Sequence, residues 1–161
     1  MKQILSKSIV LVGLMGSGKS AIGKILSERL GVPLSDTDKI IEEEVGKTIY
    51  EIFNDSGEKY FRQVEEEIVG RVLDKPAHTI STGGGSILSS KTRKAIKSKS
   101  FSIWVQCNVD IISKRIHDQE KRPLLKNKNI LDNNDNMKDE IDVLNKYVIN
   151  MMRNAHTIIL T

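Results

Sequence analysis

Short apolar runs alternate with amphipathic segments along most of the chain. The apolar runs predict β-strands at residues 8–12, 32–35, 78–81, 101–106 and 157–160. Apolar residues at helical spacing predict α-helices at residues 19–30, 38–45, 48–54, 58–72, 90–97, 110–117 and 138–154. Strands that alternate with helices favour an α/β fold of three layers, α/β/α, in which helices cover a central five-stranded parallel sheet.

Residues 118–136 depart from this pattern, because they are polar and show almost no apolar periodicity. A long segment of this kind inside a compact domain is usually functional or disordered. It contains the run Lys121-Arg122-Pro123-Leu124-Leu125, in which a guanidinium group stands beside a proline and two leucines that can dock. We therefore expect one domain over residues 1–161, with a mobile lid at 118–136 rather than a floppy surface insertion.

Composition favours a single-domain globular protein and argues against a membrane protein or a nucleic-acid-binding protein. With 161 residues, of which 39% are hydrophobic, the chain suits one domain with one core. No apolar run approaches the roughly 20 residues that a membrane-spanning helix needs, so we expect no membrane partner. The net charge is +4, but aromatic residues are only 4% and the lysines are scattered, which argues against nucleic-acid binding. The single cysteine, Cys107, excludes an internal disulfide and fits a reducing, cytoplasmic location.

A complete phosphate-binding loop follows the first predicted strand, with the sequence Gly13-Leu14-Met15-Gly16-Ser17-Gly18-Lys19-Ser20. A strand, a glycine loop and a helix form the context that this motif requires. Backbone N–H groups and the helix N-terminus attract phosphate, Lys19 would reach the β- and γ-phosphates, and Ser20 would hold Mg²⁺. We therefore expect ATP and Mg²⁺ as cofactors, with nucleotide contacts at Gly13, Met15, Gly16, Ser17, Gly18, Lys19, Ser20 and Ala21.

Two carboxylates close the second predicted strand. Asp36 and Asp38 are two residues apart, so in an extended segment both would project from the carboxyl end of the sheet, where such folds bind ligands. One would hold the water shell of Mg²⁺, and the other would accept a proton from an attacking hydroxyl. The alternative is that an aspartate only caps the following helix.

An arginine and a glycine segment suggest a second ligand. Thr82-Gly83-Gly84-Gly85 follows the third strand, where glycines would let backbone N–H groups approach a substrate; a tight turn is the alternative. Arg62 lies on the flank of an apolar helix stripe and is suited to bind a carboxylate in bidentate fashion. Its alternative is a solvated ion pair with Glu65 or Glu66.

Taken in order, these motifs resemble the shikimate kinase family, a nucleoside-monophosphate-kinase-like group of P-loop enzymes. The resemblance covers roughly residues 8–155. Besides the motifs already described, it rests on four further segments: Gly46-Lys47-Thr48-Ile49, Glu51-Ile52-Phe53, Gly57-Glu58 with Phe61-Arg62, and Arg122-Pro123-Leu124-Leu125. It implies transfer of the ATP γ-phosphate to the 3-hydroxyl of shikimate, a step of aromatic amino-acid biosynthesis.

The resemblance also implies roles for single residues. Lys19, Asp38 and Arg122 would be catalytic, with Arg122 as the lid arginine that closes on the phosphates of ATP. Ser20 and Asp36 would serve Mg²⁺, and Arg62 would pair with the shikimate carboxylate. Asp38 would contact the shikimate hydroxyls, and Gly83, Gly84 and Gly85 would line that pocket. We expect a monomer with shikimate as its small-molecule partner.

Two features depart from the family pattern. The family carries a second carboxylate-binding arginine in a pattern Arg-x-x-x-Tyr-x-x-x-Ala; aligned on Ala155, this pattern places Tyr147 at the arginine position and Met151 at the tyrosine position. Tyr147 would then be the second ligand of the carboxylate. The family also continues past the last strand, whereas this sequence ends at Thr161, so we expect either a truncated C-terminus or reduced adenine binding.

Two alternatives stay open. One is another small-molecule kinase of the same fold, acting on gluconate or a nucleotide, which the combination of Asp38, Arg62 and the glycine segment disfavours. The other is a shikimate-kinase-like binding module with weak or no catalysis, which Tyr147 and the early end favour somewhat.

Overall fold

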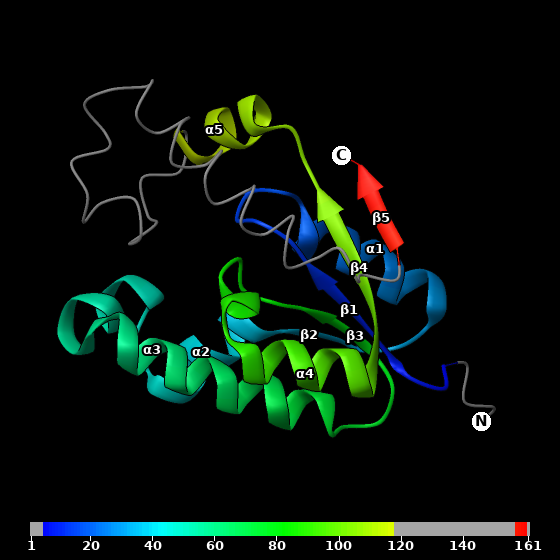
Figure 1. The fold of residues 1–161 in the computed structure, drawn as a ribbon, viewed down its shortest axis with the longest axis horizontal. Helices are drawn as coiled ribbons and strands as arrows, with labels where there is room; N and C mark the ends of the chain where they lie inside the picture. The colour runs from blue at the N-terminus through cyan, green and yellow to red at the C-terminus, as the bar shows by residue number, and fades with distance from the viewer. Residues whose placement is uncertain (1–4, 118–156, 161) are drawn as a thin grey trace.

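The structure, a computed structural model, describes residues 5–117 and 157–160 (Figure 1). Strands and helices alternate along the chain, which confirms the predicted α/β class. The elements are β1 (Ser8–Val12), α1 (Lys19–Leu30), β2 (Leu34–Asp36), α2 (Thr37–Val45), α3 (Ile49–Leu73), β3 (Thr79–Ser81), the 3₁₀ helix η1 (Ser86–Leu88), α4 (Ser90–Lys99), β4 (Ser100–Gln106), α5 (Val109–His117) and β5 (Thr157–Leu160).

The strands form one parallel sheet in the order β2-β3-β1-β4-β5. The central strand β1 therefore lies between β3 and β4, although β3 is far from it in the sequence (Figure 1). The register pairs Leu11 with Ser81 and Ser81 with Asp36, so these residues are level across three neighbouring strands. Because the strands are parallel, the phosphate loop, the glycine segment and Asp36 all leave the sheet at the same edge.

Helices cover both faces of the sheet. On one face, Val10 and Val12 belong to a buried cluster with Ile68 of α3 and Ile96 of α4. On the other face, Gly23 of α1 lies so close to the sheet that an added Cβ would stand 3.2 Å from Leu11 Cδ1. Side chains of successive strand residues point to opposite faces, so β1 is buried by helices on both sides.

The predicted helices 48–54 and 58–72 are one element, α3, that is interrupted at a single residue. Gly57 has φ 82° and ψ 168°, and this conformation kinks the helix between its two halves. Thr48 caps the N-terminus of α3 with a capping box, in which its hydroxyl accepts from the Glu51 N–H and Glu51 accepts from the Thr48 N–H. Residues on both sides of the kink are buried, among them Ile52 and Phe61.

The predicted extended segment at 35–38 is wrong. β2 ends at Asp36, and Thr37 begins α2, because the Asp36 carboxylate caps the helix N-terminus by accepting from Asp38 N–H and Lys39 N–H. The predicted lid at 118–136 and the predicted helix at 138–154 lie outside the described residues. In the part of the chain that the structure describes, no helix combines the length and the apolar character that a membrane crossing requires.

Candidate active site

A cleft of about 1340 Å³ opens at the carboxyl edge of the sheet. Its walls come from the phosphate loop and start of α1, the end of β2 and start of α2, the first half and kink region of α3, the glycine segment after β3, and Arg115 of α5. The residues from the phosphate loop and start of α1 are Met15, Gly16, Gly18, Lys19, Ser20 and Ala21. The motifs predicted to carry phosphate transfer and those predicted to bind a substrate thus share one cleft.

The phosphate loop depends on glycines at defined positions. Gly16 and Gly18 have φ of 75° and 101°, conformations that favour glycine, and a Cβ on Gly13 would stand 2.5 Å from the Val105 carbonyl oxygen. The loop ends at the N-terminus of α1. The structure describes the whole first turn of this helix, and that turn carries no acidic residue. The positive end of the helix dipole is therefore left for an anionic ligand.

Lys19 is held at the centre of the loop. Its amine donates to the carbonyl oxygens of Gly13 at 2.8 Å and Leu14 at 2.7 Å, and the residue is buried. The other predicted nucleotide contacts divide into two groups. Gly13 and Ser17 are buried and do not line the cleft, whereas the remaining residues do: Met15, Gly16, Gly18, Ser20 and Ala21. Lys19 thus lines the cleft from the loop, and its reach to the phosphates of ATP stays a prediction.

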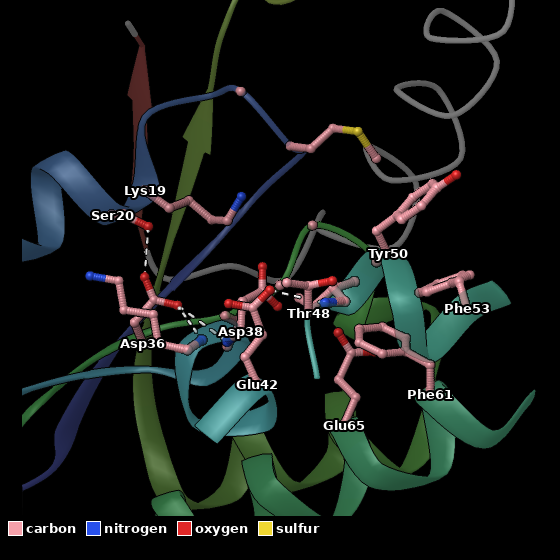
Figure 2. Close-up of a pocket in the computed structure, with 18 of the residues that line it drawn as sticks. Lys19, Ser20, Asp36, Asp38, Glu42, Thr48, Tyr50, Phe53, Phe61 and Glu65 are labelled. Atoms are coloured by element: carbon pink, nitrogen blue, oxygen red, sulfur yellow. Dashed lines mark hydrogen bonds between the residues drawn. The ribbon is translucent and has the colours of Figure 1, made fainter. Parts of the chain in front are cut away.

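Asp36 caps the following helix, as the alternative interpretation of the sequence predicts, and it also contacts Ser20; its role toward Mg²⁺ stays a prediction. Its Oδ2 accepts from the Ser20 hydroxyl at 3.0 Å, while its Oδ1 caps α2 by accepting from Asp38 N–H at 3.1 Å (Figure 2). The pair of a serine hydroxyl and a carboxylate fits Mg²⁺, which takes few protein ligands, prefers oxygen and keeps several waters. The helix cap fixes the carboxylate through Oδ1, so that Oδ2 faces Ser20.

Asp38 reaches the cleft from the first turn of α2, and not from a strand as predicted. The expected juxtaposition with Asp36 is still found, because the helix begins directly at the strand end (Figure 2). Asp38 Oδ1 lies 2.7 Å from the position where a Cβ on Gly83 would stand. The carboxylate therefore packs against the glycine segment at the floor of the cleft.

The three glycines after Thr82 lie close to other groups of the cleft, and a Cβ on any of them would force a neighbouring group to shift. None of them has a positive φ, but a Cβ on Gly83 would stand 2.6 Å from Glu65 Oε1, and one on Gly84 would stand 2.7 Å from Met15 N. A Cβ on Gly85 would stand 2.7 Å from Arg62 Nη1. A Cβ in ordinary van der Waals contact stands 3.4 Å or more from its neighbours. A side chain at any of these three positions would therefore collide with a different residue of the cleft.

The expectation that the glycine N–H groups face a substrate is not met at Gly83. The Gly83 N–H is donated to the Thr37 hydroxyl at 3.1 Å, and this bond ties the glycine segment to the start of α2. The Gly83 carbonyl is also used inside the protein, because it accepts from the Ser86 hydroxyl at 2.9 Å. The segment is thus a fixed floor that lets Arg62, Asp38 and Glu65 approach the backbone.

Arg62 lies in the cleft and forms the ion pair that the sequence offered as the alternative. Its Nη1 donates to Glu65 Oε2 at 2.6 Å, and its Nη2 lies 3.5 Å from Glu58 Oε1. The guanidinium carbon stands 5.2 Å from the centroid of the Phe61 ring. The Arg62 side chain is only 20% exposed, so it is positioned at the cleft and does not extend into solvent.

Glu65 is a site residue that the sequence interpretation missed. Its side chain is 3% exposed, and burial raises the pKa of the Glu65 carboxyl, while the nearby Arg62 lowers it and Asp38 raises it further. Four residues after Phe61 and three before Ile68, Glu65 falls on the apolar stripe of α3, and an acid on such a stripe was the available signal.

The wall formed by α2 and α3 was also missed. Glu42 accepts from Ile49 N–H at 2.9 Å and so joins the two helices. Across the Gly57 kink, the rings of Phe53 and Phe61 lie 4.7 Å apart and form an apolar side of the cleft. The remaining wall residues from these helices are Lys39, Thr48, Tyr50 and Glu51. Their roles depend on the kink, which is a three-dimensional feature.

Arg115 of α5 contacts the phosphate loop. Its Nη1 donates to the Gly16 carbonyl at 2.9 Å, and the residue lines the cleft. Nothing in the spacing of α5 singled it out. Arg122 and Tyr147, two residues to which the sequence gave roles, lie outside the described residues, and their roles stay predictions.

Comparison with known proteins agrees with this geometry. The family model described as shikimate kinase matches residues 15–159. The chain is 42% identical over 123 residues to the shikimate kinase of Caulobacter vibrioides, and the aligned region covers 76% of this chain and 62% of that protein. It is 43% identical over 120 residues to the shikimate kinase of Symbiobacterium thermophilum, and this aligned region covers 73% of this chain and 69% of that protein.

Solved structures show the same likeness. The shikimate kinase of Acinetobacter baumannii, solved in complex with shikimate, superposes with a TM-score of 0.84 at 30% identity, covering 96% of this chain and 83% of that one. The chain spans 62% of the length of the Caulobacter protein that it matches. The matched family model, the curated relatives and this superposition together show that the chain belongs to the shikimate kinase family.

Proposed function

We propose that this protein is a shikimate kinase, which transfers the γ-phosphate of ATP to the 3-hydroxyl of shikimate. The observation that carries the proposal is one cleft in which a phosphate loop faces an arginine and an aspartate. Shikimate is a small carboxylated triol, so its recognition requires a cation for the carboxylate and an acceptor for the hydroxyls. Arg62 and Asp38 supply these two groups, and the relative from A. baumannii was solved with shikimate.

The nucleotide end of the cleft is built for the phosphates of ATP. The backbone of the loop, the N-terminus of α1 and the Lys19 amine present positive charge to them. Ser20 and Asp36 would hold Mg²⁺, which when bound neutralises charge on the β- and γ-phosphates. Arg115 fixes the tip of the loop through the Gly16 carbonyl.

The end of the cleft that contains Arg62 and Asp38, called here the acceptor end, would position the hydroxyl that is phosphorylated. Phosphoryl transfer has a loose transition state, so most of the catalysis comes from alignment and charge stabilisation. Asp38 would hold the 3-hydroxyl in line and receive its proton, while Arg62 anchors the carboxylate at the opposite end of the ring. The rings of Phe53 and Phe61 exclude water from this side of the cleft.

Several parts of the proposal rest on the sequence. Residues 118–136 would form a lid within a single domain, and Arg122 would close on the phosphates. Tyr147 would take the place of a second arginine at the substrate carboxylate. A monomer is expected, and the single cysteine fits a cytoplasmic location.

A coupled assay of ADP release separates the candidate functions. Purified protein with Mg²⁺ and ATP is supplied in turn with shikimate, gluconate and nucleoside monophosphates. Turnover with shikimate alone supports the proposal, and turnover with another acceptor assigns a different kinase. Calorimetric binding of shikimate without any ADP release would instead identify a binding module.

A further inference from the structure

The Arg62–Glu65 pair leaves one carboxylate oxygen of Glu65 without a partner. Oε2 accepts from Arg62 Nη1 at 2.6 Å, whereas Oε1 is buried and has no hydrogen-bond partner within the described residues. Figure 2 shows the carboxylate directed into the cleft beside the Phe61 ring. A buried charged oxygen without a donor is costly, so this atom is a favoured position for a proton.

Acidic groups outnumber the guanidinium at this end of the cleft. On α3, Glu65 is close to Arg62 and Glu66, and Glu58 contacts the other side of the guanidinium. From α2, Asp38 Oδ1 packs against Gly83 close to Glu65 Oε1. The glycine segment contributes backbone only. The cations Lys19 and Lys39 line the same cleft.

The charge of Arg62 favours the ionised form of Glu65, against the effect of burial. Burial and Asp38 raise the pKa of Glu65, and Arg62 lowers it. A ligand carboxylate bound at Arg62 would share the same guanidinium and add a further negative charge beside Glu65. Like charges in a poorly solvated site favour protonation of one of them.

We propose that Glu65 is a positioning residue that takes up a proton from solvent when the carboxylate of the substrate binds at Arg62. The proton goes to Oε1, the oxygen without a partner, while Oε2 keeps its bond to Arg62. The full positive charge of the guanidinium is then available to the substrate. This inference rests on the proposed function, because it requires a substrate carboxylate at Arg62.

Isothermal titration of shikimate into the protein tests it directly. The titration is repeated at one neutral pH in buffers of different ionisation enthalpy, and the slope of observed enthalpy against buffer enthalpy gives the number of protons taken up. We expect net uptake of up to about one proton in the wild type, since one group titrates. Glu65→Gln should abolish this uptake.

A matched control makes the same change in the other acid that contacts Arg62. Glu58 lies 3.5 Å from Arg62 Nη2, but its side chain is 56% exposed, so its carboxylate is solvated. Glu58→Gln should therefore retain the proton uptake of the wild type. A slope of zero in the wild type, or equal slopes in the wild type and Glu65→Gln, would overturn the inference.

A second measurement needs no variant and covers the case in which Glu65→Gln does not fold. Proton uptake requires the Kd for shikimate to rise with pH across the neutral range, and a Kd independent of pH contradicts it. The two proposals fail differently. If shikimate neither binds nor is turned over, the proposed function fails; if it binds without proton uptake, only the role of Glu65 fails.

Discussion

Two neighbouring glycines should affect opposite ends of the cleft when each is changed to alanine. A Cβ on Gly85 would stand 2.7 Å from Arg62 Nη1 and 2.8 Å from Arg62 Cζ, so the guanidinium must move. A Cβ on Gly84 would stand 2.7 Å from Met15 N, which belongs to the phosphate loop. Neither glycine has a positive φ, so alanine brings no backbone strain to either site.

The magnitude follows from the contact that each change disturbs. Displacing Arg62 removes a charge-assisted hydrogen bond to the substrate carboxylate, worth about 1.5–3 kcal/mol. At about 1.4 kcal/mol per tenfold, Gly85→Ala should raise KM for shikimate by about tenfold to about 150-fold and leave KM for ATP nearly unchanged. Gly84→Ala pushes on backbone and should instead raise KM for ATP, by about tenfold or more.

The assay is ADP release with one substrate varied and the other saturating, for the wild type and both variants. Thermal melting reports whether each variant is folded. Gly85→Ala should melt close to the wild type, because its neighbour is the end of a long side chain that can shift. If both variants raised the same KM, or if Gly85→Ala left KM for shikimate unchanged, the packing of Arg62 on this segment would not matter for binding.

Four further results are expected. Lys19→Ala should lower kcat by about 10²-fold or more in the ADP-release assay, the scale of one lost transition-state donor, and near-normal turnover would exclude the kinase function. Asp38→Asn should lower kcat strongly but leave ATP affinity by calorimetry intact; loss of both would assign Asp38 to the metal. Tyr147→Arg should lower KM for shikimate, and an unchanged KM would refute the predicted register. Burial raises the pKa of Glu65 above 4.5, so its protonation stabilises the fold fully below pH 4.5 and progressively less as pH rises through the folded pKa. The melting temperature of the wild type relative to Glu65→Gln should therefore fall over that window, and a constant difference would contradict the shift.

Local motifs made the nucleotide end of the cleft predictable. The phosphate loop needs only a strand, a fixed glycine spacing and a helix, all of which are contiguous in the sequence. The bounds predicted for β1 and α1 agree with the structure for the same reason. Asp36 was predicted at the correct edge, although the extended geometry offered for Asp38 was wrong because a helix cap ended the strand.

The acceptor end depends on contacts between distant segments, which periodicity does not encode. Glu65 and Gly83 are brought together by the packing of α3 on the glycine segment, so the acid on the apolar stripe of α3 did not reveal which residue it would approach. The Gly57 kink was predicted only as a gap between two helices, yet it sets where Phe53 lies relative to Phe61.

We propose that Arg62 and Asp38 in the cleft select shikimate as the phosphate acceptor. The most direct test is mass spectrometry of the reaction product after incubation with Mg²⁺, ATP and an equimolar mixture of shikimate, gluconate and nucleoside monophosphates. The wild type should yield phosphorylated shikimate, and Arg62→Ala should lose this product. Phosphorylation of another acceptor, or shikimate phosphate formed equally by Arg62→Ala, would contradict it.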